Sequence, residues 1–117
     1  MNIKYKNKTV QKQCTELRRA KKDFGIFGED VIAKINLIEE MASFHDIINY
    51  PTLHCHQLNG KLKNFWSIDV KGRKCSLRMI LAPLDDDEKM VEADANFAST
   101  CKSLNIILIE EVNNHYE

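Results

Sequence analysis

The sequence predicts an α+β fold, with an N-terminal helical hairpin packed on one face of a small antiparallel β-sheet. Three observations predict this fold. Residues 9–42 repeat apolar side chains at helical spacing, residues 53–81 alternate like a β-hairpin, and residues 105–112 form a nearly continuous β-branched run. Because 117 residues suffice for one hydrophobic core but not for two, we expect residues 1–117 to form a single domain.

The chain begins with a segment typical of a strand at a sheet edge. Between residues 2 and 8, Ile3 and Tyr5 alternate with lysines, which discourage pairing with a further strand. Thr9 can cap a basic amphipathic helix that ends at Gly25. The apolar stripe of this helix consists of Val10, Cys14, Leu17 and Phe24.

A second helix is expected from Gly28, because Glu29 and Asp30 favour the positive end of a helix dipole. Its inward-facing residues are Val31, Ile35, Ile38 and either Met41 or Ala42. The segment from Ser43 to Asp46 has the form of a capping box and predicts one further short helical turn, which ends before Pro51.

The hairpin of residues 53–81 contains the position that most needs an explanation. A tight basic turn over residues 71–74 joins its two strands, and alternation places Arg78 on the face opposite to Leu77 and Met79. An arginine in an otherwise apolar strand must reach solvent, pair with a carboxylate or bind an anion such as phosphate. The apolar residues of the two strands are Trp66, Ile68 and Val70, then Cys75, Leu77, Met79 and Leu81.

The acidic run of residues 85–88 is typical of the first turn of a helix, and we expect an inserted helix from about Asp87 to Leu104. The last strand, residues 105–112, leads to a tail that contains His115 and Tyr116. These two side chains can reach Arg78 if the last strand lies next to the strand of Arg78. The apolar stripe of the inserted helix consists of Met90, Ala93, Phe97, Cys101 and Leu104.

The net charge of zero conceals an alternation of basic and acidic segments. Residues 1–22 contain eight Lys or Arg and one acid, and residues 52–84 contain six and one, whereas residues 23–51 and 85–117 are acidic. If the first helix lies beside the hairpin, the two basic segments form one surface suited to a polyanion. The alternative is that these charges only solvate the outer faces of helices.

The sequence lacks the motifs of several classes of protein. No apolar run is long enough to span a bilayer and the first residues lack the apolar core of a secretory signal, so we expect a cytoplasmic protein without membrane contact. The four cysteines form no C-x-x-C pair, which favours reduced thiols. Motifs of nucleotide cofactors, serine hydrolases and zinc proteases are absent, and we expect no cofactor. His54 and His56 offer two metal ligands without a convincing third, so no metal site is predicted.

Arg78, the cations around the hairpin and the terminal His115 and Tyr116 form a set suited to RNA cleavage without a metal. A ribose 2′-hydroxyl must lose a proton as it attacks the adjacent phosphorus, the phosphorane charge must be neutralised, and the leaving 5′-oxygen must gain a proton. Histidine can act as acid or base, arginine binds two phosphate oxygens, and tyrosine stacks on a base or donates a hydrogen bond. The alternative is that His115 is an ordinary surface residue.

The segment LNGKLKNFWSI, residues 58–68, resembles the RelE/ParE superfamily of bacterial toxins, specifically its HigB-like "plasmid maintenance killer" branch. It matches the family pattern Leu-Lys-Gly-x-Leu-x-x-x-Trp-x-Ile. The element order, the strand arginine and the terminal histidine-tyrosine extend the resemblance over nearly the whole chain. The resemblance implies the toxin of a type II toxin–antitoxin system in the bacterial cytoplasm, an endoribonuclease that cuts messenger RNA on the ribosome. It also implies a hetero-oligomer with a cognate helix-turn-helix antitoxin.

By position, the resemblance assigns catalytic roles to three residues. Arg78 takes the place of the arginine that contacts the scissile phosphate, and His115 and Tyr116 take the place of the terminal signature that transfers protons. The residues that would bind RNA are Lys61, Lys63, Arg73 and Lys74.

Three features depart from the family pattern. The lysine before the glycine is Asn59 here, for which Lys61 could substitute, the hairpin turn is longer than in compact members, and the inserted helix is an addition. Two alternatives stay open: a non-enzymatic ParE-like toxin that poisons DNA gyrase, and a catalytically decayed module that binds RNA or protein. The histidine-tyrosine ending disfavours the first, while Asn59 and the neutral net charge favour the second.

Overall fold

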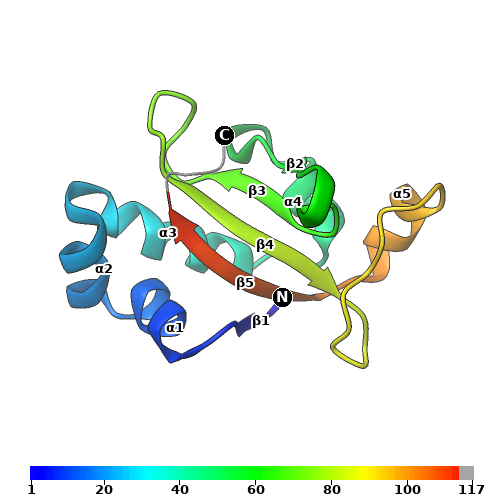
Figure 1. Cartoon of the computed structure of the whole chain (residues 1–117), viewed down its shortest axis with the longest axis horizontal. Helices are drawn as coiled ribbons and strands as arrows, with labels where there is room; N and C mark the ends of the chain where they lie inside the picture. Colours follow the sequence, from blue (N-terminus) through cyan, green and yellow to red (C-terminus); the bar gives the residue numbers. More distant parts are fainter. Residues whose placement is uncertain (114–117) are drawn as a thin grey trace.

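The computed structural model describes residues 1–113, and in them one mixed sheet is the centre of the fold (Figure 1). Its strands lie in the order β1-β5-β4-β3-β2. Their bounds are Asn2–Tyr5 for β1, His56–Gln57 for β2, Trp66–Asp69 for β3, Arg78–Leu84 for β4 and Ile106–Asn113 for β5. The predicted α+β class is confirmed, and β1 lies at the sheet edge as expected.

One pairing of the sheet differs from the antiparallel arrangement that we predicted. β1 runs parallel to β5, whereas β5, β4, β3 and β2 pair antiparallel. Alternation along a strand specifies which face is buried but not the direction of its neighbour. Because helices and a hairpin separate β1 from β5 in the chain, the long connection permits parallel pairing.

The predicted helical hairpin is present, but its first arm is broken. α1 spans Lys8–Thr15 and α2 spans Leu17–Phe24, with Glu16 in an extended conformation between them. The 3-10 turn η1, Gly25–Phe27, then leads to α3, Gly28–Glu39. The break lets α1 contact β5 of the sheet as well as α3, whereas α2 packs mainly on α3. Leu17, predicted to face the core, is therefore 46% exposed.

Two local features begin these helices. The side chain of Asn7, rather than the predicted Thr9, caps α1 by accepting a hydrogen bond of 2.9 Å from the backbone of Val10. At the start of α3, a Cβ on Gly28 would lie 2.6 Å from the backbone nitrogen of Lys21 and 2.7 Å from the carbonyl carbon of Ala20. Only glycine lets α2 and α3 approach so closely.

The hydrophobic core lies between one face of the sheet and the helices, and Figure 1 shows α3 behind β5 in that view. The buried residues of α3 are Gly28 and, as predicted, Val31, Ile35 and Ile38. α4, Phe44–Ile48, begins at the predicted capping box of Ser43. Its Phe44 ring lies edge-on to Trp66 at 5.3 Å between centroids, and Phe97 stacks on the same Trp66 at 5.3 Å. Short 3-10 turns, η2 (Pro51–Leu53) and η3 (Gly60–Leu62), lead to β3.

The inserted helix predicted from Asp87 to Leu104 is wrong for most of its length. Residues 85–96 form turns and extended chain, and only α5 (Phe97–Thr100) and η4 (Cys101–Ser103) are helical. The Asp85 carboxylate accepts hydrogen bonds from the backbone nitrogens of Asp87 and Lys89, at 2.9 and 3.0 Å. Such a side-chain turn competes with a helix, and Glu88 adopts a positive φ of 61°.

The predicted β-hairpin is confirmed as β3 and β4, with a longer connection. The last pair before the loop is Asp69 with Arg78, so residues 70–77, called the connection below, join the two strands instead of a turn over residues 71–74. Gly72 has a φ of 74°, which other residues rarely adopt. Within residues 1–113 no helix is long and apolar enough to cross a membrane.

Candidate functional site

A buried ion pair lies at the end of the hairpin where the connection joins β3 to β4. Asp69 of β3 and Arg78 of β4 face each other across the sheet, and Nε of Arg78 lies 3.2 Å from Oδ1 of Asp69. The two side chains are 1% and 4% exposed. Because cross-strand partners share a face, both lie on the side of the sheet opposite to the helices. Of the three roles open to a strand arginine, pairing with a carboxylate is the one observed.

Arg78 also holds the end of the connection in place. Its Nη1 donates hydrogen bonds to the carbonyl oxygen of Leu77, at 3.0 Å, and to that of Cys75. Within residues 1–113 its Nη2 makes no hydrogen bond. On the same face, Oδ2 of Asp69 and Oγ of Ser67 are buried and have no hydrogen-bond partner among residues 1–113.

The connection carries exposed cations beside this pair. Nη1 of Arg73 lies 3.2 Å from the same Oδ1 of Asp69, although the Arg73 side chain is 57% exposed. Lys71 forms an exposed pair with Asp30 at 3.4 Å, and Lys74 is exposed. The structure therefore brings Arg73 and Arg78, two of the predicted site residues, onto one carboxylate oxygen.

Two other predicted residues lie elsewhere. Lys61 belongs to η3 and Lys63 follows it, so both precede the Trp66 end of β3, whereas the connection begins at the Asp69 end. Lys63 lines a small hollow of about 100 Å³ together with Glu92 and Asp94. The structure does not group these lysines with Arg73 and Lys74.

The predicted residues His115 and Tyr116 lie outside the described residues. The last described residue, Asn113, pairs with Arg78 across β4 and β5. The condition for the tail to reach Arg78, that the last strand lies next to the strand of Arg78, is therefore met.

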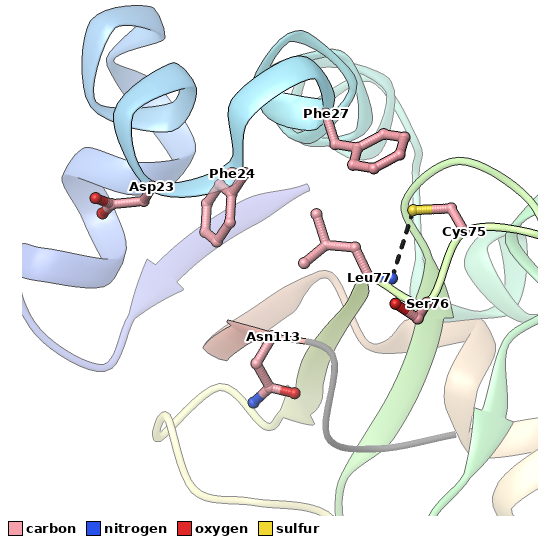
Figure 2. A pocket seen from close by; sticks show the side chains of 7 residues that line it. All are labelled: Asp23, Phe24, Phe27, Cys75, Ser76, Leu77 and Asn113. Carbon is pink, nitrogen blue, oxygen red and sulfur yellow. Dashed lines mark hydrogen bonds between the residues drawn. The ribbon is translucent and has the colours of Figure 1, made fainter.

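A cavity of about 340 Å³ opens between the helices and the connection. Figure 2 shows the rings of Phe24 and Phe27 directed toward the connection, one beside Leu77 and the other beside Cys75. The thiol of Cys75 accepts a hydrogen bond of 3.4 Å from the backbone of Leu77. The remaining lining residues are Asp23, Ser76 and Asn113.

Sequence reasoning did not find this cavity. Phe24 was assigned to the apolar stripe of a helix, and Phe27 received no role. The two glycines that flank Ile26 and Phe27 were the available signal, because such a turn can display aromatic side chains away from a core.

A second hollow, about 210 Å³ in volume, lies between α1 and α2 and is strongly basic. Its lining residues are Lys12, Glu16, Arg18, Arg19 and Lys22. Arg19 pairs with a lining residue of the first cavity, because its Nε lies 2.8 Å from Oδ2 of Asp23. Hydrogen bonds from Gln13 and Arg19 lower the pKa of the Asp23 carboxyl group, so it is ionised at neutral pH.

Within residues 1–113 the structure shows neither a metal site nor a reactive thiol. The rings of His54 and His56 lie 5.3 Å apart, but residues 1–113 hold no group of three or more possible ligands. The four cysteines are free. Burial raises the pKa of Cys14 and Cys55 to about 12 and also raises that of Cys101, so these thiols are protonated at neutral pH.

Comparisons with known proteins leave the family open. The sequence matches no protein-family model, and no curated protein matches it. The candidate function therefore depends on the geometry of this site and on the resemblance noted in the sequence.

Proposed function

We propose that this chain is the toxin of a type II toxin–antitoxin system, similar to the HigB-like branch of the RelE/ParE superfamily, and that it cleaves messenger RNA on the ribosome. One observation carries the proposal. Pairing of β4 with β5 places Asn113 opposite Arg78, whose partner Asp69 on the neighbouring strand also contacts Arg73 of the connection. His115 follows Asn113 by two residues, which span at most about 7 Å of chain; we propose that its side chain acts at Arg78.

The proposed reaction is attack of a ribose 2′-hydroxyl on the adjacent phosphorus. His115 takes or returns the proton, and Tyr116 stacks on a base or donates a hydrogen bond. Arg73 is the exposed cation that a phosphate meets first, because it can exchange the Asp69 carboxylate for a phosphate oxygen. Arg78, fixed by Asp69 and two carbonyl groups, retains Nη2 for the phosphate and positions the connection.

The order of elements supports the same proposal. A first strand, two helical arms, a hairpin and a last strand follow one another, as the resemblance leads us to expect. The remaining proposed contacts are those of Lys61, Lys63 and Lys74 with RNA. The proposed partners are a helix-turn-helix antitoxin, which would form a hetero-oligomer with this chain, and the ribosome with its messenger RNA.

Induced expression in bacteria, followed by mapping of messenger RNA 5′ ends, tests the proposal. We expect growth arrest and new 5′ ends within translated codons, both lost in His115→Ala and reduced in Arg73→Ala. Lys102→Ala, an exposed cation on η4, is the matched control and should remain toxic. Intact messenger RNA with gyrase-linked DNA breaks would instead identify a gyrase poison.

One observation favours a second candidate, a module that binds RNA without cutting it. Arg78 is held by a buried carboxylate, and a side chain that is 4% exposed must lose that partner or move before it can grip a phosphate with both terminal nitrogens. Normal growth on induction, with RNA bound by the purified protein, would select this candidate.

A further inference from the structure

The first cavity and the basic hollow lie side by side on one surface. Arg19 lines the hollow, Asp23 lines the cavity, and their side chains meet at 2.8 Å. Lys22, also in the hollow, directly precedes Asp23 in α2. On the other side of the cavity, Arg73 and Lys74 directly precede the lining residue Cys75. The segments on both sides of the cavity, α2 and the connection, therefore carry cations, although Arg73 itself contacts Asp69 on the sheet face opposite to the helices.

The cavity between these cations has the character of a stacking site. Its volume of about 340 Å³ lies at the lower end of the ~300–1,000 Å³ range of small-ligand sites, which suits one ring system rather than a folded segment. Figure 2 shows Phe24 and Phe27 presenting their rings to this space, while the carboxylate of Asp23 points away from them. The acid is neutralised by Arg19 and does not repel an anion from the cavity mouth.

The hollow supplies cations that the protein itself does not neutralise. Within residues 1–113, Lys12, Arg18 and Lys22 form no ion pair, in contrast to Arg19 and Lys21, which pair with Asp23 and Glu29. Unpaired exposed cations beside a groove are the feature by which proteins follow the backbone of a single strand.

We propose that this surface binds single-stranded RNA, with one nucleobase inserted between Phe24 and Phe27 and the flanking phosphates on the basic hollow and the connection. The inference rests on the proposed function for its ligand, and it assigns to α2 and η1 a base-binding role outside the residues that cut. Stacking on phenylalanine tolerates any base, so the cavity fixes the position of the strand rather than its sequence. An apolar side chain of a protein partner would use the two rings but not the cations on both sides.

Binding of a labelled 2′-O-methyl RNA octamer, measured by fluorescence anisotropy, tests this proposal without cleavage. Phe27 is the residue to change, because it is not part of the hydrophobic core cluster, whereas Phe24 packs against that cluster. Phe27→Ala should weaken binding at least about fivefold, the loss expected for one stacked base. Ile26→Ala is the matched control, since Ile26 lies in the same turn but is 85% exposed and outside the cavity.

A second probe separates stacking from charge. An abasic ribose-phosphate octamer should bind Phe27→Ala and the parent protein equally well, because it has no ring to insert. Arg18→Gln and Lys22→Gln should each lower the slope of log K against log salt by ~0.7 for the base-containing octamer. Lys102→Gln should leave that slope unchanged, since it lies on η4, outside the hollow.

The outcomes distinguish this proposal from the function proposed above. Equal octamer affinities for Phe27→Ala and Ile26→Ala would overturn the base site and leave the cavity to a protein partner, whatever the protein does to messenger RNA. Octamer binding that falls as expected, in a protein that cuts no messenger RNA, would retain the site and reject the nuclease. Phe27→Leu, which keeps apolar volume but removes the ring, replaces Phe27→Ala if thermal melting shows that the alanine variant is unfolded.

Discussion

Two arginines from different regions of the molecule meet the same carboxylate oxygen. Arg78 lies in a central strand and Arg73 in the exposed connection, and each has a guanidinium nitrogen 3.2 Å from Oδ1 of Asp69. Their side chains are 4% and 57% exposed. The two contacts therefore have the same length, and they differ in how far each arginine side chain is exposed to solvent.

The difference in solvent determines what each arginine contributes. Charges removed from water interact strongly but have lost several kcal/mol of hydration each, so loss of one buried partner leaves the other without compensation. An exposed pair is worth only about 0–1 kcal/mol, because water and salt screen it. Arg78 thus stabilises the sheet. Arg73 can leave Asp69 with little loss of folding free energy, which would allow it to bind a phosphate in the proposed function.

Removal of the shared carboxylate should have the largest effect. Asp69→Ala leaves Arg78 charged and buried without its partner, so we expect a loss of about 3–5 kcal/mol in the free energy of unfolding. Urea titration monitored by the fluorescence of Trp66 measures this loss. Asp86→Ala, which removes an exposed acid, should change stability by less than about 0.5 kcal/mol.

A double substitution tests whether the loss in Asp69→Ala comes from the unpaired charge of Arg78. Asp69→Leu combined with Arg78→Met replaces both charges by apolar groups, and it should recover most of the stability that Asp69→Ala loses. A double variant as unstable as Asp69→Ala would show that packing of the aspartate, not its charge, supports the strands.

Removal of the buried arginine alone should have a smaller effect. In Arg78→Met the carboxylate keeps Arg73 as a partner at 3.2 Å, so the loss should approximate that of hydrogen bonds to a charged group, about 1.5–3 kcal/mol. The same urea titration, run beside Asp69→Ala, measures the difference. Equal losses for the two variants would mean that Arg73 gives the buried carboxylate no support.

Sequence patterns predicted the strand and face of Arg78 but not its partner. Alternation through Trp66, Ile68 and Val70 identified the strand of β3, and it separated Arg78 from the apolar face. It did not identify Asp69 as the partner, because cross-strand neighbours depend on register and the predicted turn was too short. Register is set by the whole connection, including Gly72, and not by the strands alone.

The remaining failures arise from specific contacts, local or tertiary, that composition and periodicity do not reveal. The acidic residues from Asp85 onward have the composition of a helix start, yet one hydrogen-bonded aspartate fixes a turn there instead. The helical period through Leu17 is regular, but the helix breaks at Glu16, and α1 contacts β5 as well as α3 whereas α2 packs mainly on α3. The cavity of Phe24 and Phe27 exists only where α2 meets the connection, and no local pattern specifies that meeting.

Removal of the exposed arginine should have the smallest effect on folding and should isolate its role with RNA. Because the Arg73 side chain is 57% exposed and Arg78 remains as a partner of Asp69, Arg73→Gln should change the free energy of unfolding by less than about 1 kcal/mol. Its loss should nevertheless remove one phosphate contact and lower the salt slope of octamer binding by ~0.7. Lys102→Gln, with an unchanged slope, controls for total charge. A stability loss as large as that of Arg78→Met would make both arginines structural, and the connection would then need Lys74 alone to bind phosphate.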